Sequence, residues 1–195
     1  TADNMAQYLR HIRGIGPCVL HAYPSSAHAL AAYMLAAGEP APQNIRAILL
    51  ESETVYPDQR ETMEKAFGVR VFSSYGHSEK CVLAAQCDHG QDYHVWPTYG
   101  YFELLDEQGT PIATAGQEGE IVGTGFINTV MPFIRYCTGD HATYVGERCE
   151  ACGRQHTVLR DFKGRWPQGG LIAADGSVVS MTALNVHDDT FRHVR

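Results

Sequence analysis

The sequence predicts an α/β protein. A parallel, Rossmann-like α/β subdomain over residues 1–80 precedes an antiparallel, barrel-like β subdomain over residues 81–165. Two observations predict this fold. Before residue 80, helical segments alternate with short strands that are too apolar to face water, which indicates a parallel sheet with helices on both faces. After residue 80, helical periodicity disappears and turns such as "DEQG" and "AGQEG" separate strand-like runs.

Helical periodicity is clearest at the start of the chain. Met5, Leu9 and Ile12 are spaced three or four residues apart, and the pattern stops at Gly14. Two further helices are expected between strands, because each of these segments ends at a glycine that can terminate a helix. The predicted helices cover residues 2–14, 24–38 and 56–68, and the predicted strands cover residues 18–23, 45–52 and 69–76.

The second half contains strand patterns instead. Runs rich in β-branched and aromatic residues are bounded by turn residues, and the "ADGS" sequence predicts one hairpin near the end of the chain. The predicted strands cover residues 82–87, 93–106, 118–126, 131–145 and 156–165.

Composition and charge argue against several classes of partner and location. The net charge is −7, from 15 basic and 22 acidic residues, and no run of Lys or Arg occurs, which argues against a nucleic-acid partner. No apolar stretch reaches the roughly 18–20 residues that cross a bilayer, so no membrane insertion is expected. No signal peptide is visible, and six irregularly spaced cysteines do not resemble a secreted disulfide framework. The cytoplasm is therefore the expected location.

Polar residues follow several predicted strands. "ESETVYP" comes at the end of the strand over 45–52, "YGHSEK" follows the strand residues 69–74, and "PFIRYCTGD" ends on Asp140. Ligands of parallel α/β sheets bind beyond the carboxyl ends of the strands, so each stretch is a candidate site. From spacing alone, each can equally be a polar turn, because such residues are common loop punctuation.

Five motifs in order give a resemblance to a known family. "YGHSE", "GEIVGTGF", "PFIRYCTGD", "CEACGR" and "FKGR" resemble the adenylate-forming superfamily, in particular its phenylacetate-CoA ligase-like branch, which includes CapK-like proteins of capsular polysaccharide loci. The match runs from about residue 18 to the end of the chain. The resemblance implies that ATP and a small-molecule carboxylic acid form an acyl-adenylate. A thiol, usually that of coenzyme A, then displaces AMP.

The resemblance also implies roles for individual residues. The predicted catalytic residues are Glu79, which holds Mg²⁺, and Ser78, which contacts the phosphate. Tyr75 stacks on adenine, and Gly76 lets the ligand approach the backbone.

The remaining residues carried over by motif contact the nucleotide. Asp140 binds the ribose hydroxyls, and Tyr136 lies beneath the nucleotide. Ser52 and Glu53 match the adenine loop, and Arg165 matches an arginine near the hinge that reaches the ribose.

The sequence departs from the family in several places. The Gly/Ser/Thr-rich phosphate loop and the catalytic lysine have no match, the hinge acid is not evident in "GRWPQGG", and Glu51 replaces a glycine of the adenine loop. Residues 166–195 match only the hinge and the start of a C-terminal domain. The expectation is a central fragment of the large N-terminal domain, inactive alone with at most weak nucleotide affinity. A homodimer is usual in the branch.

The pair Cys149 and Cys152 suggests half of a structural zinc site, which needs four ligands from two turns. Cys87 with His94, or with His89, can supply the other half. The resemblance to phenylacetate-CoA ligase-like proteins favours His94. A free pair or a disulfide is the alternative reading.

Two further points stay open. "AYPSSAHAL" follows a strand end and is a candidate acyl pocket lined by His21, Tyr23 and His28, although these residues can equally pack the helix. The alternative to a ligase is a zinc-stabilised module without catalysis that binds a nucleotide or a partner.

Overall fold

The computed structural model describes residues 2–164, 170–172 and 178–180. Its first half alternates helices and strands as predicted. The elements are α1 (Ala2–Gly14), β1 (Cys18–Ala22), α2 (Pro24–Ala37), β2 (Ile45–Leu50), α3 (Pro57–Phe67) and β3 (Val71–Gly76). Helices α2 and α3 end at Gly38 and Gly68, which have a φ of 66° that glycine adopts without steric cost.

The second half consists of strands. They are β4 (Leu83–Gln86), β5 (Tyr93–Val95), β6 (Gly100–Leu105), β7 (Glu118–Gly125), β8 (Tyr136–Gly146) and β9 (Val158–Lys163). A hairpin of β10 (Gly170–Ile172) and β11 (Val178–Ser180) follows, as the "ADGS" sequence predicted. No helix in the described part of the chain is long and apolar enough to cross a membrane.

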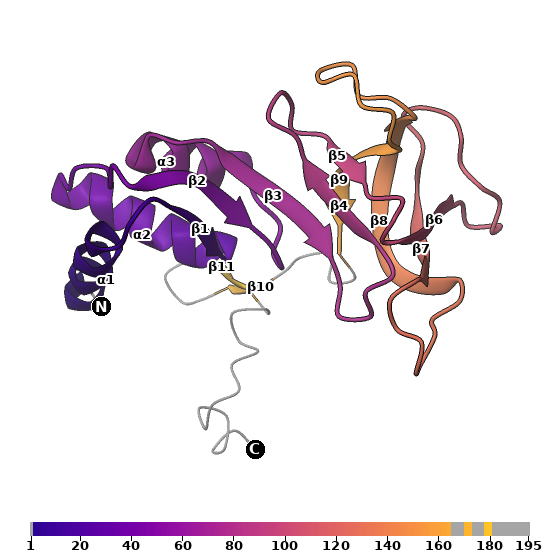
Figure 1. Cartoon of the computed structure of the whole chain (residues 1–195), viewed down its shortest axis with the longest axis horizontal. Helices are drawn as coiled ribbons and strands as arrows, with labels where there is room; N and C mark the ends of the chain where they lie inside the picture. Colours follow the sequence, from indigo (N-terminus) through magenta and orange to yellow (C-terminus); the bar gives the residue numbers. More distant parts are fainter. Residues whose placement is uncertain (1, 165–169, 173–177, 181–195) are drawn as a thin grey trace.

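A single nine-stranded sheet runs through both halves. The strand order is β1-β2-β3-β4-β5-β9-β8-β7-β6. Figure 1 shows the helices beside β1 to β3 and a strand-only part beyond them. Strands β1, β2 and β3 are parallel, and every later pairing in this sheet is antiparallel. The predicted α/β class is confirmed.

Strand β3 joins the two halves. Its first residues, from Val71 to Ser73, pair in parallel with β2, and its last residues, from Ser74 to Gly76, pair antiparallel with β4. The hydrophobic core is divided accordingly. One buried cluster lies under the helices and includes Ile48, and a second lies inside the β half and includes Ile121.

The described helices cover one face of β1–β3, whereas the sequence predicted helices on both faces. Helices α2 and α3 pack against each other, and Leu9 of α1 joins the same core. On the opposite face, Val19 and His21 of β1 are exposed. The reason is topological: successive right-handed crossovers that add strands in one direction place their helices on the same side.

The predicted strand over residues 93–106 is two strands. Strand β5 pairs with β4 and β9, while β6 pairs with β7 at the far edge of the sheet. The chain turns between them, where the N–H of Tyr99 donates to the carbonyl of Trp96 over 3.1 Å. Pro97 lies in this turn and has no N–H to continue a strand ladder.

Candidate functional site

The turn after β3 lies against strand β8. The hydroxyl of Tyr75 donates a hydrogen bond of 2.9 Å to Oδ2 of Asp140. The ring of Tyr75 packs on Phe162 of β9, with 4.6 Å between ring centroids. The residue predicted to stack on adenine and the residue predicted to bind ribose are therefore direct neighbours.

A second tyrosine–carboxylate bond holds Glu79. The Tyr136 hydroxyl donates to Oε1 of Glu79 over 2.8 Å, and Nδ1 of His77 lies 3.1 Å from Oε2. The hydrogen bond from Tyr136 lowers the pKa of the Glu79 carboxyl below its ordinary value, and His77 adds to this. Glu79 is thus held ionised at neutral pH, which suits a ligand for a hard cation such as Mg²⁺.

Glycines of the β half let this turn lie directly on the sheet. A Cβ atom at Gly100 would lie 1.9 Å from the carbonyl oxygen of Cys81, and one at Gly123 would lie 2.8 Å from the Cβ of Cys81. Side chains at these two positions would push the turn away from β6 and β7. The sequence analysis missed this role. Glycines inside predicted strands are the signal that could have shown it, because they often mark a close backbone approach.

Four further residues were predicted to contact the nucleotide or its phosphates: Ser52, Glu53, Ser78 and Arg165. Ser52 follows β2 with a φ of 69°. The Glu53 carboxylate accepts hydrogen bonds from the N–H of Ser25 over 2.8 Å and from its hydroxyl over 3.0 Å. Ser25 lies in the first turn of α2, where a negative charge is favourable, so Glu53 stabilises the start of that helix. Ser78 is exposed at the turn, and Arg165 lies outside the described residues.

The four residues of the predicted metal site converge. Cys87 directly follows β4, His94 lies in β5, and Cys149 and Cys152 lie on the turn between β8 and β9. One ligand atom from each lies within 4.8 Å of the others, and Nε2 of His94 is 3.9 Å from Sγ of Cys152. Tetrahedral zinc with bonds of about 2.3 Å places its sulfur ligands about 3.8 Å apart, so the cluster has a suitable size. His89 is exposed beside Asp88 and lies outside the cluster.

The chemistry of this cluster also suits a metal. Burial lowers the pKa of His94, which keeps the imidazole neutral and able to bind a cation. Burial alone would raise the pKa of the Cys152 thiol, but hydrogen bonds from the Arg154 backbone and from the other two thiols of the cluster lower it. Three cysteines and one histidine form a common ligand set for structural zinc.

Comparison with known proteins connects this geometry to a family. The chain is 27% identical to protein CapK of Staphylococcus aureus over 138 residues, and 34% identical to phenylacetate-coenzyme A ligase of Aromatoleum evansii over 84 residues. Its fold matches a solved 2-hydroxyisobutyryl-CoA ligase with a TM-score of 0.71 over 83% of this chain, at 22% identity. These similarities in sequence and fold bear out the predicted resemblance to the adenylate-forming superfamily.

Other comparisons show how much of each similar protein the chain covers. An anthranilate CoA ligase solved with anthranoyl-AMP matches 92% of this chain with a TM-score of 0.61 and 18% identity. The matched part of the chain spans 29% of the length of CapK and 19% of the phenylacetate-coenzyme A ligase. In the two solved ligases it covers 36% and 35% of their chains. No protein-family model matches the sequence.

The stretch "AYPSSAHAL", the candidate acyl pocket, lines part of a cavity of about 440 Å³. The cavity is bounded by α1, β1 and the start of α2, and Met5, Leu20 and Leu30 are among its lining residues. His21, Tyr23 and His28 do not line it. His21 instead lies on the exposed sheet face, where its Nε2 is 3.1 Å from Glu51.

Proposed function

We propose that this chain forms the central part of the nucleotide site in an enzyme that activates a carboxylic acid with ATP and transfers the acyl group to coenzyme A. The observation that carries this proposal is the pair of bonds Tyr75–Asp140 and Tyr136–Glu79, which join the "YGHSE" and "RYCTGD" motifs. Solved relatives of the same fold contain acyl-AMP and CoA, which supports the assignment of substrate classes.

The two carboxylates have separate tasks in this proposal. Asp140 accepts hydrogen bonds from the ribose hydroxyls, since an ionised carboxylate is a strong acceptor. Glu79 contributes an oxygen to Mg²⁺, which supplies positive charge to the phosphates when bound. Tyr136 and His77 position Glu79 through its two oxygens.

The nucleotide rests on backbone and ring surfaces in this proposal. The ring of Tyr75 offers a face to adenine, and Gly76 admits the ligand close to the strand. Ser78 is exposed and free to reach a phosphate oxygen. Ser52 and Glu53 are proposed to contact the base, and the motif match assigns Arg165 to the ribose.

The chain alone is expected to be catalytically inactive. The Gly/Ser/Thr-rich phosphate loop and the catalytic lysine of the family have no counterpart in its sequence. The leaving pyrophosphate would therefore lack its main positive partner, and electrostatic stabilisation of this kind is usually the largest part of catalysis.

Zinc is proposed as a structural component. Cys87, His94, Cys149 and Cys152 would hold it in a closed four-ligand site that leaves no position for a substrate. The ion would join the β4–β5 hairpin to the β8–β9 turn and so keep β8, which carries Asp140, beside the turn after β3. All six cysteines are free thiols in the structure, which suits a reducing compartment such as the cytoplasm.

ATP–pyrophosphate exchange on the full-length protein, measured across a panel of carboxylic acids, tests the ligase proposal. Exchange with at least one acid is expected, and Asp140→Asn should raise the KM for ATP. Exchange with no acid, in protein that still binds ATP, would instead favour the zinc-stabilised binding module.

A further inference from the structure

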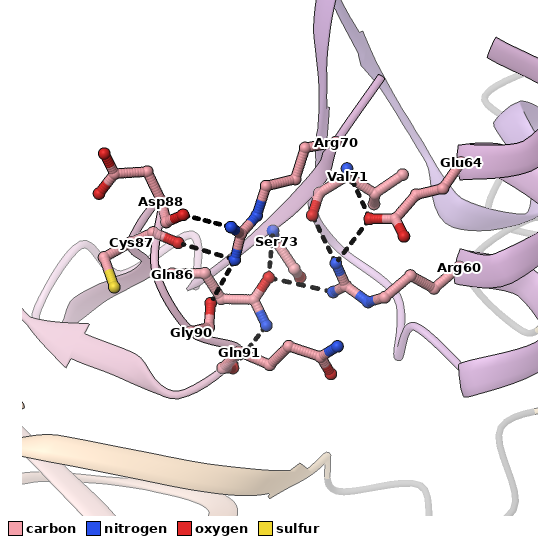
Figure 2. A network of polar contacts seen from close by, with 10 residues as sticks. All are labelled: Arg60, Glu64, Arg70, Val71, Ser73, Gln86, Cys87, Asp88, Gly90 and Gln91. Carbon is pink, nitrogen blue, oxygen red and sulfur yellow. Dashed lines mark hydrogen bonds and ion pairs between the residues drawn. The ribbon is translucent and has the colours of Figure 1, made fainter. Parts of the chain in front are cut away.

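Two arginines of the α/β half hold the loop that carries Cys87. This loop, residues 86–92, runs from the last residue of β4 to the residue before β5; Cys87 lies in it, and His94 follows two residues after it. Arg60 lies in α3, and Arg70 is the residue directly before β3. Figure 2 shows the Arg70 guanidinium directed at the backbone of the loop, and the Arg60 guanidinium, which comes from the helix, directed at Val71 and the side chain of Gln86.

Arg70 binds the backbone of the loop at several points. Its Nη1 donates to the carbonyl of Asp88, and its Nη2 donates to the carbonyls of Gly90 over 2.9 Å and Cys87 over 3.4 Å. The planar guanidinium presents its donors in a fixed fork and can bind several acceptors at once. The guanidinium also lies over the ring of Phe72, 5.3 Å from its centroid, which fixes its direction.

Arg60 acts through Gln86, the residue before Cys87. Its Nη2 donates to Oε1 of Gln86 over 3.0 Å, and the same oxygen accepts the N–H of Ser73 over 2.9 Å. The amide nitrogen of Gln86 donates to the carbonyl of Gln91 over 2.6 Å, which closes the loop across its base. Nη1 of Arg60 donates to the carbonyl of Val71 in β3.

We propose that Arg70, assisted by Arg60, is a positioning residue of the metal site and shapes the 86–92 loop before the ion binds. The inference rests on the proposed zinc site. Three of the four cluster residues lie on loops or turns, and the loop of Cys87 has three of its carbonyls bound by an arginine that lies outside the ligand set. Partners outside the ligand shell typically change metal affinity 10–100-fold, because they fix the direction of the ligands.

The test compares Arg70→Gln with Arg46→Gln, which removes an exposed arginine of the neighbouring strand β2. Zinc affinity is measured by competition with a chelator. Co²⁺ absorption reports the geometry of the site, and hydrogen exchange of residues 86–92 is followed in the metal-free protein. Arg70→Gln should weaken zinc binding about 10-fold, alter the Co²⁺ spectrum and speed exchange of the loop. Arg46→Gln should match the wild type in all three measurements.

The outcomes separate this inference from the zinc proposal. A wild-type protein that binds no zinc would remove the site itself. Zinc binding by the wild type with unchanged affinity in Arg70→Gln would remove only the role of Arg70, whatever the exchange rates show. Because Arg60 is largely buried, with 11% of its side chain exposed, Arg60→Gln can destabilise the fold, and the decision therefore rests on Arg70.

Discussion

The hydroxyl of Tyr75 and the carboxylate of Asp140 are joined by a hydrogen bond of 2.9 Å, although the two residues are 65 positions apart. The bond connects the end of β3, which belongs to both halves of the sheet, to β8 in the β half. It therefore fixes the relative position of the two motifs that are proposed to contact the nucleotide.

Tyr75→Phe is expected to lower the free energy of unfolding by about 1–2 kcal/mol, because it removes a hydrogen bond to a charged group and leaves the ring in place. Urea denaturation measures the change. Tyr101→Phe is the matched control, since Tyr101 is 60% exposed, and it should stay within about 0.5 kcal/mol of the wild type. Equal stability of the two variants would contradict the prediction.

Tyr136→Phe should raise the pKa of Glu79 toward its ordinary value of 4.5, because the Tyr136 hydroxyl is the main cause of the lowered value. A carboxyl with a lowered pKa in the folded state stabilises the protein above its unfolded pKa, and this contribution is lost as the pH falls through the folded pKa. The variant should therefore be less stable at neutral pH and lose less stability below pH 4.5. NMR titration of the Glu79 carboxyl in Mg²⁺-free buffer checks this, and an unchanged midpoint would refute it.

Purified protein should contain about one equivalent of zinc, and Cys149→Ser should release it. Removing the metal with a chelator should lower Tm by about 5–15 °C, because the ion binds only the folded arrangement of its ligands. Elemental analysis and thermal unfolding measure both effects. Cys137→Ser is the control, since Cys137 is exposed and lies outside the cluster, and it should retain the metal. Metal loss from both variants, or from neither, would count against the assigned ligands.

Gly100→Ala should destabilise the protein by about 3 kcal/mol or more. The new methyl group would overlap the carbonyl of Cys81 at 1.9 Å, and backbone on both sides limits relaxation. Gly146→Ala is the control, because nothing lies within 4 Å of its added Cβ. Denaturant midpoints of the two variants give the comparison, and a stable Gly100→Ala protein would show that the turn after β3 can move away from β6.

Local signals in the sequence predicted most elements of the fold. Apolar spacing and terminal glycines placed α1, α2 and α3 within one or two residues of their observed bounds. The interruption at Pro97 was missed because the aromatic and β-branched residues around it favour a strand, although the proline itself argues against one continuous strand; pairing with different neighbours separates β5 from β6.

The sequence predicted which motifs form the candidate site, but it did not predict the contacts between them. Sequence order alone suggested Glu79 and Asp140, but it could not show that each carboxylate is bound by a tyrosine of the opposite motif. Glu53 shows the same limit: its bonds to Ser25 depend on β2 and α2 lying side by side.

By itself, the sequence determined the order of helices and strands, the motifs that resemble the adenylate-forming superfamily and the residue types of the proposed metal site. These features depend on neighbouring residues or on short spacings. Only the tertiary structure decided that the described helices share one face, that Glu53 caps α2, and that Arg60 and Arg70 hold the Cys87 loop. Such contacts join residues brought together by strand register and crossover direction, which are set by the summed packing of the whole sheet.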